Sequence, residues 1–162
     1  MEDLSLHIMD IVENSLRAGA SRIDIRMIEN KKDDFLTLEI EDNGKGMDKE
    51  SLENAANPFY TTKQGKKFGL GLSMLSQACR EAEGEMKIES CTGEGTEAQR
   101  HRGTKVIATF KMDHIDMKPI GDIEKTLKVL RATHPEVNLS FDYVIKQGTK
   151  AQSGKGTEYE NL

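Results

Sequence analysis

The chain has 162 residues, 36% of them hydrophobic and 31% charged, and its formal net charge is −5. This length fits one domain with a real hydrophobic core, and no apolar run approaches the ~20 residues that a membrane span requires. The acidic balance argues against a general polyanion binder, because non-specific nucleic-acid binding rests on a basic surface. The N-terminus is acidic and does not resemble a signal peptide. We therefore expect a cytoplasmic protein that engages neither membrane nor nucleic acid.

The spacing of apolar residues predicts the first elements of the fold. Apolar side chains three and four positions apart predict a helix over residues 4–18, which Gly19 would end. Strict alternation then predicts two strands, over 22–28 and 36–40. The polar segment 29–34 between them indicates an antiparallel hairpin.

The rest of the chain repeats these two patterns. The remaining predicted elements are a short helix at 48–56 capped by Asp48, a helix at 70–83 ended by Gly84, strands near 86–88 and at 104–111, a helix at 121–132 and a last strand at 139–145. The polar stretches 57–69 and 92–103 are expected to be exposed loops. Because the strands come in adjacent pairs, we expect an α+β fold whose mixed, mostly antiparallel sheet carries helices on one face.

Asp10 and Asn14 stand four positions apart in the first predicted helix, so their side chains share one face. The Asn14 amide offers a neutral carbonyl oxygen, which Mg²⁺ accepts alongside water and phosphate oxygens. Asp10 is a candidate to orient or deprotonate an attacking water. For this pair taken alone, a solvated helix face remains the competing interpretation.

A glycine-rich turn, Asp42-Asn43-Gly44-Lys45-Gly46-Met47, directly follows the second predicted strand. A carboxylate at a strand end, here Asp42, can accept a hydrogen bond from the amino group of adenine. A partly buried acceptor selects strongly for a base that carries this donor. Gly44 and Gly46 permit positive φ and the close approach of a ligand. Ordinary turn chemistry is the alternative.

Two further motifs favour phosphate binding. Thr62 and Lys63 lie in the stretch 57–69, which is rich in Gly, Lys and Thr, and they can reach phosphate oxygens. The segment Gly69-Leu70-Gly71-Leu72 opens a predicted helix, where free backbone N–H groups and small residues form an anion site. Its spacing fits neither the dinucleotide fingerprint nor a P-loop.

Together the four motifs supply a metal ligand, a base-reading carboxylate, cationic lid residues and a phosphate-binding helix start. We therefore predict a site for ATP and Mg²⁺. In this arrangement the chain resembles the superfamily of gyrase B, Hsp90, sensor histidine kinases and MutL. Asp10 to Ala20 is similar to its N box, Asp42 to Met47 to its G1 box, Pro58 to Lys63 and Gly69 to Leu72 to the F and G2 boxes of histidine kinases, and Gly103-Thr104 to a late Gly-Thr pair.

The resemblance covers about residues 3–112 and implies a Bergerat α/β sandwich with a flexible lid between the third and fourth motifs. Residues 1–112 would form the ATP-binding domain, and 113–146 would add a helix and a strand to the same domain, either extending the sheet or forming a docking edge. Residues 147–162 are expected to be a disordered tail. By position, the implied ATP-binding residues are Asn14, Asp42, Gly44, Gly46, Met47, Thr62, Lys63, Gly69, Leu70, Gly71, Leu72 and Thr104.

Within this set the resemblance implies that Asn14 is also the metal ligand and that Thr104 helps to hold the Asp42 carboxylate. Asp10 would be catalytic, but it stands where the ATP-hydrolysing and serine-kinase branches usually place glutamate, which favours slow hydrolysis. Phe68 stands where histidine kinases commonly have threonine. Because the N box begins at Asp10, we expect no preceding helical hairpin with a phosphoacceptor histidine and hence no complete sensor kinase.

The leading functional hypothesis is a stand-alone regulatory protein that binds Mg²⁺–ATP and phosphorylates or switches a separate protein. Stand-alone anti-sigma serine kinases resemble it in size and layout. The alternatives are a non-catalytic, ATP-dependent protein-binding module, a slow ATPase, and a repair ATPase like MutL, which the missing transducer domain and the acidic charge disfavour. A domain without any ligand is the remaining alternative. The sequence does not identify the partner protein, and it leaves open whether the chain forms a homodimer.

Overall fold

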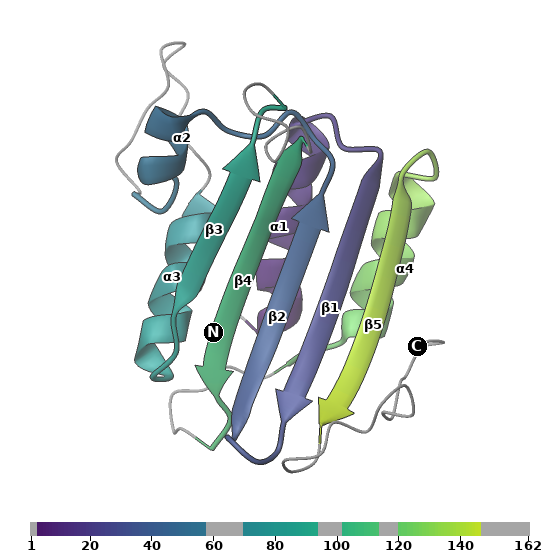
Figure 1. Cartoon of the computed structure of the whole chain (residues 1–162). Helices are drawn as coiled ribbons and strands as arrows, with labels where there is room; N and C mark the ends of the chain where they lie inside the picture. The colour runs from purple at the N-terminus through teal and green to yellow at the C-terminus, as the bar shows by residue number, and fades with distance from the viewer. Residues whose placement is uncertain (1–2, 58–69, 94–101, 114–119, 147–162) are drawn as a thin grey trace.

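The computed structural model describes residues 3–57, 70–93, 102–113 and 120–146. The elements, in chain order, are α1 (Leu4–Arg17), β1 (Arg22–Asn30), β2 (Phe35–Asp42), α2 (Lys49–Glu53), α3 (Leu70–Glu81), β3 (Met86–Cys91), β4 (Gly103–Lys111), α4 (Ile123–Thr133) and β5 (Asn138–Lys146). The five strands form one sheet in the order β3-β4-β2-β1-β5 (Figure 1). No helix in these ranges is long and apolar enough to span a bilayer.

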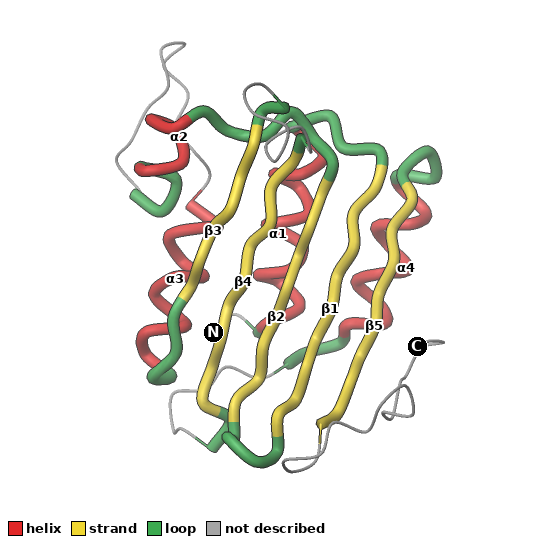
Figure 2. The backbone as a smooth tube through the Cα atoms, in the orientation of Figure 1, coloured by secondary structure: helices red, strands yellow, loops and turns green. Residues whose placement is uncertain are grey.

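The sheet is mixed, with a single parallel contact. β1 pairs antiparallel with β2, β2 with β4, and β4 with β3, whereas β5 runs parallel to β1. The helices α1, α3 and α4 lie together on one face of this sheet, and α2 sits beside the end of β3 (Figures 1 and 2). The predicted mostly antiparallel sheet with helices on one face is therefore confirmed.

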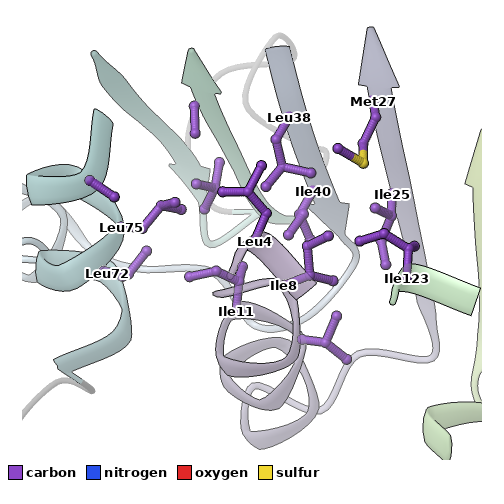
Figure 3. Close-up of a cluster of buried hydrophobic side chains, with 14 of the residues drawn as sticks. Leu4, Ile8, Ile11, Ile25, Met27, Leu38, Ile40, Leu72, Leu75 and Ile123 are labelled. Carbon is purple, nitrogen blue, oxygen red and sulfur yellow. The ribbon is translucent and has the colours of Figure 1, made fainter. Parts of the chain in front are cut away.

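The core forms where the apolar rows of the strands meet the apolar stripe of α1. In β1 and β2 every second residue points toward the helices, so that Ile25 and Ile40 are both almost fully buried. Leu4, Ile8 and Ile11 on α1 pack against these rows (Figure 3). Burying each of these side chains contributes about 1.5–3 kcal/mol of transfer free energy. This packing fixes α1 across the middle of the sheet.

The ends of α1 follow local chemistry. The Asp3 side chain caps the first turn by accepting the Leu6 N–H, and hydrogen bonds from Ser5 and Leu6 hold the pKa of Asp3 below its usual value. At the other end Gly19 has φ of 76°, a left-handed conformation that stops the helix, as the sequence predicts. The exit from α1 therefore leads directly into β1.

The last helix and strand extend the sheet. β5 pairs with β1 along its whole length, from Arg22↔Asn138 to Asn30↔Lys146. It therefore lies at an edge of the same sheet, and α4 packs on the helix-bearing face behind it (Figure 1). The tail expected at 147–162 lies outside the described residues.

The two cysteines differ in burial, and this difference predicts their reactivity. Neither is disulfide-bonded, Cys79 is fully buried, and burial raises the pKa of its thiol to about 12. Because the thiolate is the reactive form, only about one Cys79 thiol in ten thousand is ionised near pH 8. We expect iodoacetamide to label Cys91 but not Cys79 in the native protein, and both in denaturant, as counted by mass spectrometry. Equal labelling of both native thiols would contradict this.

Candidate functional site

The candidate site is built where β2 ends beneath α1. Asp42, the last residue of β2, is 9% exposed, and the Ser15 hydroxyl on α1 donates a 2.5 Å hydrogen bond to its Oδ2 atom. Ser15 directly follows Asn14, so this bond brings the first and second sequence motifs together. The helix and the strand end are thus joined by a buried polar contact.

The other oxygen of the Asp42 carboxylate faces two backbone donors. The Gly44 N–H lies 2.8 Å from Oδ1 and the Thr104 N–H lies 3.2 Å from it. A carboxylate has about four lone-pair positions, and these two bonds with the Ser15 bond use three of them. The described residues therefore hold the carboxylate rigidly and leave acceptor capacity for one more donor.

Glycines allow the backbone to approach this carboxylate closely. A Cβ atom at Gly44 would lie 2.8 Å from Ala18 Cβ, and one at Gly103 would lie 2.0 Å from the Asp42 carbonyl oxygen. Gly103 has φ of 143°, which glycine adopts most readily. These two positions let α1 and β4 close on the end of β2, and this closure puts the Gly44 and Thr104 N–H groups within reach of Oδ1.

The predicted freedom of positive φ is used at Gly46 and not at Gly44. Gly46 has φ of 74°, and a Cβ there would lie 2.0 Å from the Cys91 carbonyl oxygen. The close approach at both glycines is therefore to the protein's own chain. The sequence motif predicts the glycines for ligand access, but in the structure they first serve packing.

Thr104 contributes to the carboxylate through its backbone. Its N–H reaches Asp42, while its hydroxyl lies 2.7 Å from the Ser90 hydroxyl. Ser90 also accepts the Met47 N–H at 2.8 Å and donates to the Gly103 carbonyl oxygen at 3.1 Å. Thr104, Met47 and the carboxylate thus belong to one hydrogen-bonded group that ties β3 and β4 to the glycine-rich turn.

Asp10 meets the fourth motif across the α1–α3 contact. A Cβ placed on Gly71 would lie only 2.9 Å from Asp10 Cβ, so the two helices touch backbone to side chain at this point. Gly71 is the second residue of α3. Its backbone N–H is therefore one of the first four in the helix, which have no acceptor within the helix. The candidate catalytic carboxylate therefore lies beside the N-terminal turn of α3.

We expect Gly71→Ala to destabilise the protein despite the better helix propensity of alanine. The propensity gain is about 1 kcal/mol in an exposed helix, but the added methyl group would displace Asp10 or move α3, at about 1–3 kcal/mol. Urea unfolding should show a net loss for Gly71→Ala and almost no change for the exposed control Gln77→Ala. A gain in stability for Gly71→Ala would mean that the helices separate easily here.

Asn14 is half-buried on the same side of α1 as Asp10. Its Oδ1 atom lies 3.4 Å from an Arg17 guanidinium nitrogen, a long contact on an exposed part of the helix. Arg17 also pairs with Glu13 at 3.7 Å, with both side chains largely exposed. Exposed contacts of this kind contribute little, so Arg17 can release the Asn14 oxygen easily.

The remaining predicted residues divide into two groups. Leu72 is 4% exposed and points into the core, so its side chain cannot contact a ligand without rearrangement. Leu70 is the first residue of α3. Thr62, Lys63 and Gly69 lie outside the described residues. Hydrogen bonds bring Asp42, Gly44, Met47 and Thr104 into one group, Gly46 packs against Cys91 beside it, and Gly71 lies against Asp10 in a second contact. Asn14 stands on α1 one turn after Asp10 and next to Ser15, which bonds to Asp42.

Sequence reasoning missed Ser15, Ser90 and Arg17. Ser15 falls on the apolar stripe of the first helix, and a hydroxyl there, followed by burial to 3% exposure, signals a polar partner inside the fold. Arg17 follows Asn14 by three positions, so the helical period places it on the same face. Ser90 gives no comparable signal, because its partners are joined only by strand pairing.

The fold and the site define a class of protein, an α/β sandwich with a firmly held carboxylate under its first helix. The chain matches the family model described as Histidine kinase-, DNA gyrase B-, and HSP90-like ATPase over residues 2–114. The chain belongs to this family, which confirms the resemblance seen in its sequence.

Relatives come from two branches of the family. Sporulation kinase C of Bacillus subtilis is 33% identical over 88 residues, 54% of this chain and 20% of the relative. The human mismatch repair endonuclease PMS2 is 30% identical over 119 residues, 68% of this chain and 12% of the relative. The MutL ATPase domain of Aquifex aeolicus, solved with ADP, has the same fold with a TM-score of 0.53 and 16% identity, over 94% of this chain and 62% of that one. The chain thus spans a fifth or less of these two curated relatives.

Proposed function

We propose that this domain binds Mg²⁺–ATP beside α1 and uses the nucleotide to phosphorylate, or to switch, a separate partner protein. The observation that carries the proposal is the Asp42 carboxylate. Three protein donors hold it in place, and its remaining acceptor capacity fits one amino group of a purine base. A buried acceptor fixed in this way selects for adenine over a base with a carbonyl oxygen at the same position.

The metal ligand in this proposal is Asn14. The described residues contain no cluster of three or more His, Cys, Asp or Glu side chains that could hold a metal ion by themselves. If Asn14 holds magnesium, the ion would take its other ligands from water and phosphate oxygens, which is how it commonly binds with nucleotides. The long Arg17 contact uses one of the two lone pairs of the Asn14 side-chain oxygen, and the other can bind the ion.

The phosphate end of the site would lie at the start of α3. The N-terminus of this 12-residue helix presents backbone N–H groups and the positive end of the helix dipole. Gly71 keeps this turn against Asp10, so an anion bound there would be close to the candidate base. Bound ATP supplies an activated phosphoryl group, and the chain's own residues orient it and neutralise its charge.

Asp10 has a side chain one methylene shorter than glutamate, and this favours a second candidate function. A base that falls short of the attacking group by about 1 Å can lose a factor of about one hundred in rate. The domain would then act as a nucleotide-dependent binding module with little turnover. In that case a partner would recognise the ATP-bound form.

One experiment separates these functions. The protein is incubated with γ-labelled Mg²⁺–ATP, alone and with extract of its source cells, and free phosphate and labelled proteins are followed. Label on a second protein supports phosphoryl transfer, whereas free phosphate alone supports a switch ATPase. ATP binding with neither product supports the binding module. No calorimetric binding of Mg²⁺–ATP would refute the whole proposal.

We expect Asp10→Asn to lower turnover or transfer by about a hundredfold or more while leaving ATP affinity within a few-fold of the original, since an amide cannot accept the proton. Single-turnover rates and calorimetric dissociation constants, measured on the same preparation, provide the test. Glu13→Gln, an exposed change one turn away on α1, serves as control. If Asp10→Asn turns over normally, Asp10 is not the base.

A further inference from the structure

Two hydrogen bonds show which backbone groups of the edge strand β5 face its neighbour β1. The Asn138 N–H donates to the Ser21 carbonyl oxygen, and the Lys31 N–H donates to the Lys146 carbonyl oxygen. In a parallel pair the residues that bond to the neighbour alternate along the strand. In β5 the backbone N–H and C=O groups of the even-numbered residues therefore point toward β1. Those of the odd-numbered residues point the opposite way, toward the open edge of the sheet.

α4 covers one part of this edge. The Arg131 guanidinium donates a 3.1 Å hydrogen bond to the carbonyl oxygen of Leu139, one of the outward-facing residues. Glu124 lies seven positions before Arg131, so both side chains emerge from the same side of α4. Arg131 thus covers the edge of β5 at Leu139, and Glu124 lies near Phe141 and Tyr143 further along the strand.

A hollow of about 420 Å³ opens beside this second part of the edge. Its lining joins the N-terminal end of α4 to the helix-facing side of β5, with apolar side chains on its floor and carboxylates beside them. The lining residues are Ile120, Gly121, Asp122, Ile123, Glu124, Phe141 and Tyr143. Because Phe141 and Tyr143 are two positions apart, both point to the same face of the strand.

The chemistry of this hollow suits a cationic side chain. The Tyr143 hydroxyl donates to the Glu29 carboxylate, which holds the tyrosine ring in place. Phe141 and Tyr143 offer aromatic surface, and Glu124 and Asp122 contribute the only charges of the lining, both negative. Arginine and lysine bury their aliphatic stems on such surfaces and keep the cation near carboxylates and ring faces.

We propose that the second half of β5, Phe141 to Ile145, is a docking edge for an extended, basic segment of another protein. The segment would add to β5 as a sixth strand, and one of its arginine or lysine side chains would enter the hollow. Strand addition supplies main-chain hydrogen bonds, and a pocket that reads alternate side chains supplies specificity. The edge pairs with β1 without a bulge or a proline, so it can receive a regular strand.

The charges favour a different protein over a second copy of this chain. If two β5 strands paired along this half, the Asp122 and Glu124 carboxylates of both copies would lie on the same face of the joined sheet. Like charges brought close together repel and destabilise the contact. A basic segment removes this repulsion and replaces it with attraction.

The proposal can be tested by nuclear magnetic resonance on the full chain with a defined probe. The probe is a capped hexapeptide, Thr-Val-Arg-Val-Thr-Val, titrated to about millimolar concentration, and the matched control peptide carries Glu in place of Arg. We expect the amide signals of Phe141 and Ile145 to shift with the Arg peptide. The same signals should respond at least about threefold more weakly to the Glu peptide, because its carboxylate faces Glu124.

Two variants locate the interaction. Glu124→Lys should weaken the Arg peptide by about three- to tenfold, whereas Glu136→Lys, the same charge change in the turn before β5, should not. Ile145→Pro removes an outward-facing N–H, a position that tolerates proline in an edge strand, and should abolish binding. Thermal melting checks that each variant is folded. If Ile145→Pro does not fold, Glu124→Lys, a surface change, still tests the proposal.

Three results would overturn the proposal. The first is an equal response to the two peptides, or shifts confined to other elements. The second is slow hydrogen exchange at Phe141 and Ile145 in the free monomer, which would mean that the chain's own tail already covers the edge. The third is a concentration-dependent dimer that Ile145→Pro dissolves, which would assign the edge to a second copy. None of these readouts depends on nucleotide binding.

Discussion

Asp42→Asn is expected to reduce the affinity for Mg²⁺–ATP by about ten- to a hundredfold. The amide retains one oxygen but replaces the other with an NH₂ group, which is a donor. If the NH₂ faces α1, it meets the Ser15 hydroxyl, and if it faces the turn, it meets the Gly44 and Thr104 N–H groups. The orientation toward the turn sets donor against donor in a buried place, which costs about 1–3 kcal/mol. In the orientation toward α1 the Ser15 hydroxyl can rotate and accept from the NH₂, and the site then offers adenine a neutral acceptor in place of a carboxylate.

The sharpest readout for this variant is the preference between two nucleotides. Inosine triphosphate carries a carbonyl oxygen where ATP carries the amino group, so the original protein should strongly prefer ATP. In Asp42→Asn this preference should largely disappear. Glu41→Gln makes the same chemical change at the exposed neighbouring residue and should alter neither affinity nor preference. If calorimetry finds the preference unchanged in Asp42→Asn, Asp42 does not read the base.

Asn14→Ala is expected to remove the contribution of magnesium to ATP binding. The Asn14 oxygen is the protein's proposed ligand to the ion, and losing an interaction with a charged group costs about 1.5–3 kcal/mol, or roughly ten- to a hundredfold in affinity. Titrations with and without chelator should therefore differ for the original protein and coincide for the variant. Core packing should be little affected, because Asn14 is only half-buried.

Two companion variants make the magnesium result specific. Asn14→Asp retains an oxygen ligand and should keep a dependence on magnesium, since carboxylates are good ligands for this ion. Arg17→Ala removes the 3.4 Å hydrogen bond to the Asn14 side-chain oxygen. This variant should leave the dependence on magnesium intact or strengthen it. An unchanged effect of magnesium on ATP binding in Asn14→Ala would mean that another group is the metal ligand.

The sequence predicts most of the fold because buried apolar residues recur with the period of the helix or strand that carries them. The alternation of Ile23, Ile25 and Met27 predicts a half-buried strand, and the structure has one there. Gly19 marks the end of α1, and Asp48 marks the start of α2. What periodicity cannot give is the partner of each strand, so the parallel pairing of β5 with β1 comes from the structure alone.

The candidate site divides along the same line. The residue types needed for adenine and magnesium stand in short motifs, and the sequence predicts Asn14 and Asp42 for these two roles. Of the three residues that hold Asp42 in position, Gly44 lies in the same motif, whereas Ser15 and Thr104 come from distant segments that only the three-dimensional structure brings to it. Sequence reasoning assigned this role to the threonine as a residue, and the structure assigns it to the Thr104 N–H group.

The single parallel pairing also has a consequence for biosynthesis. The segment that matches the family model ends at residue 114, but β1 within it gains its second neighbour only when Ser140, 116 positions after Asp24, has left the ribosome. Until then one side of β1 is an open template for wrong pairing, and Ile23 and Ile25 lack part of their cover. A chain shortened to the family segment should therefore aggregate more readily than the full chain, whatever its nucleotide site can still bind.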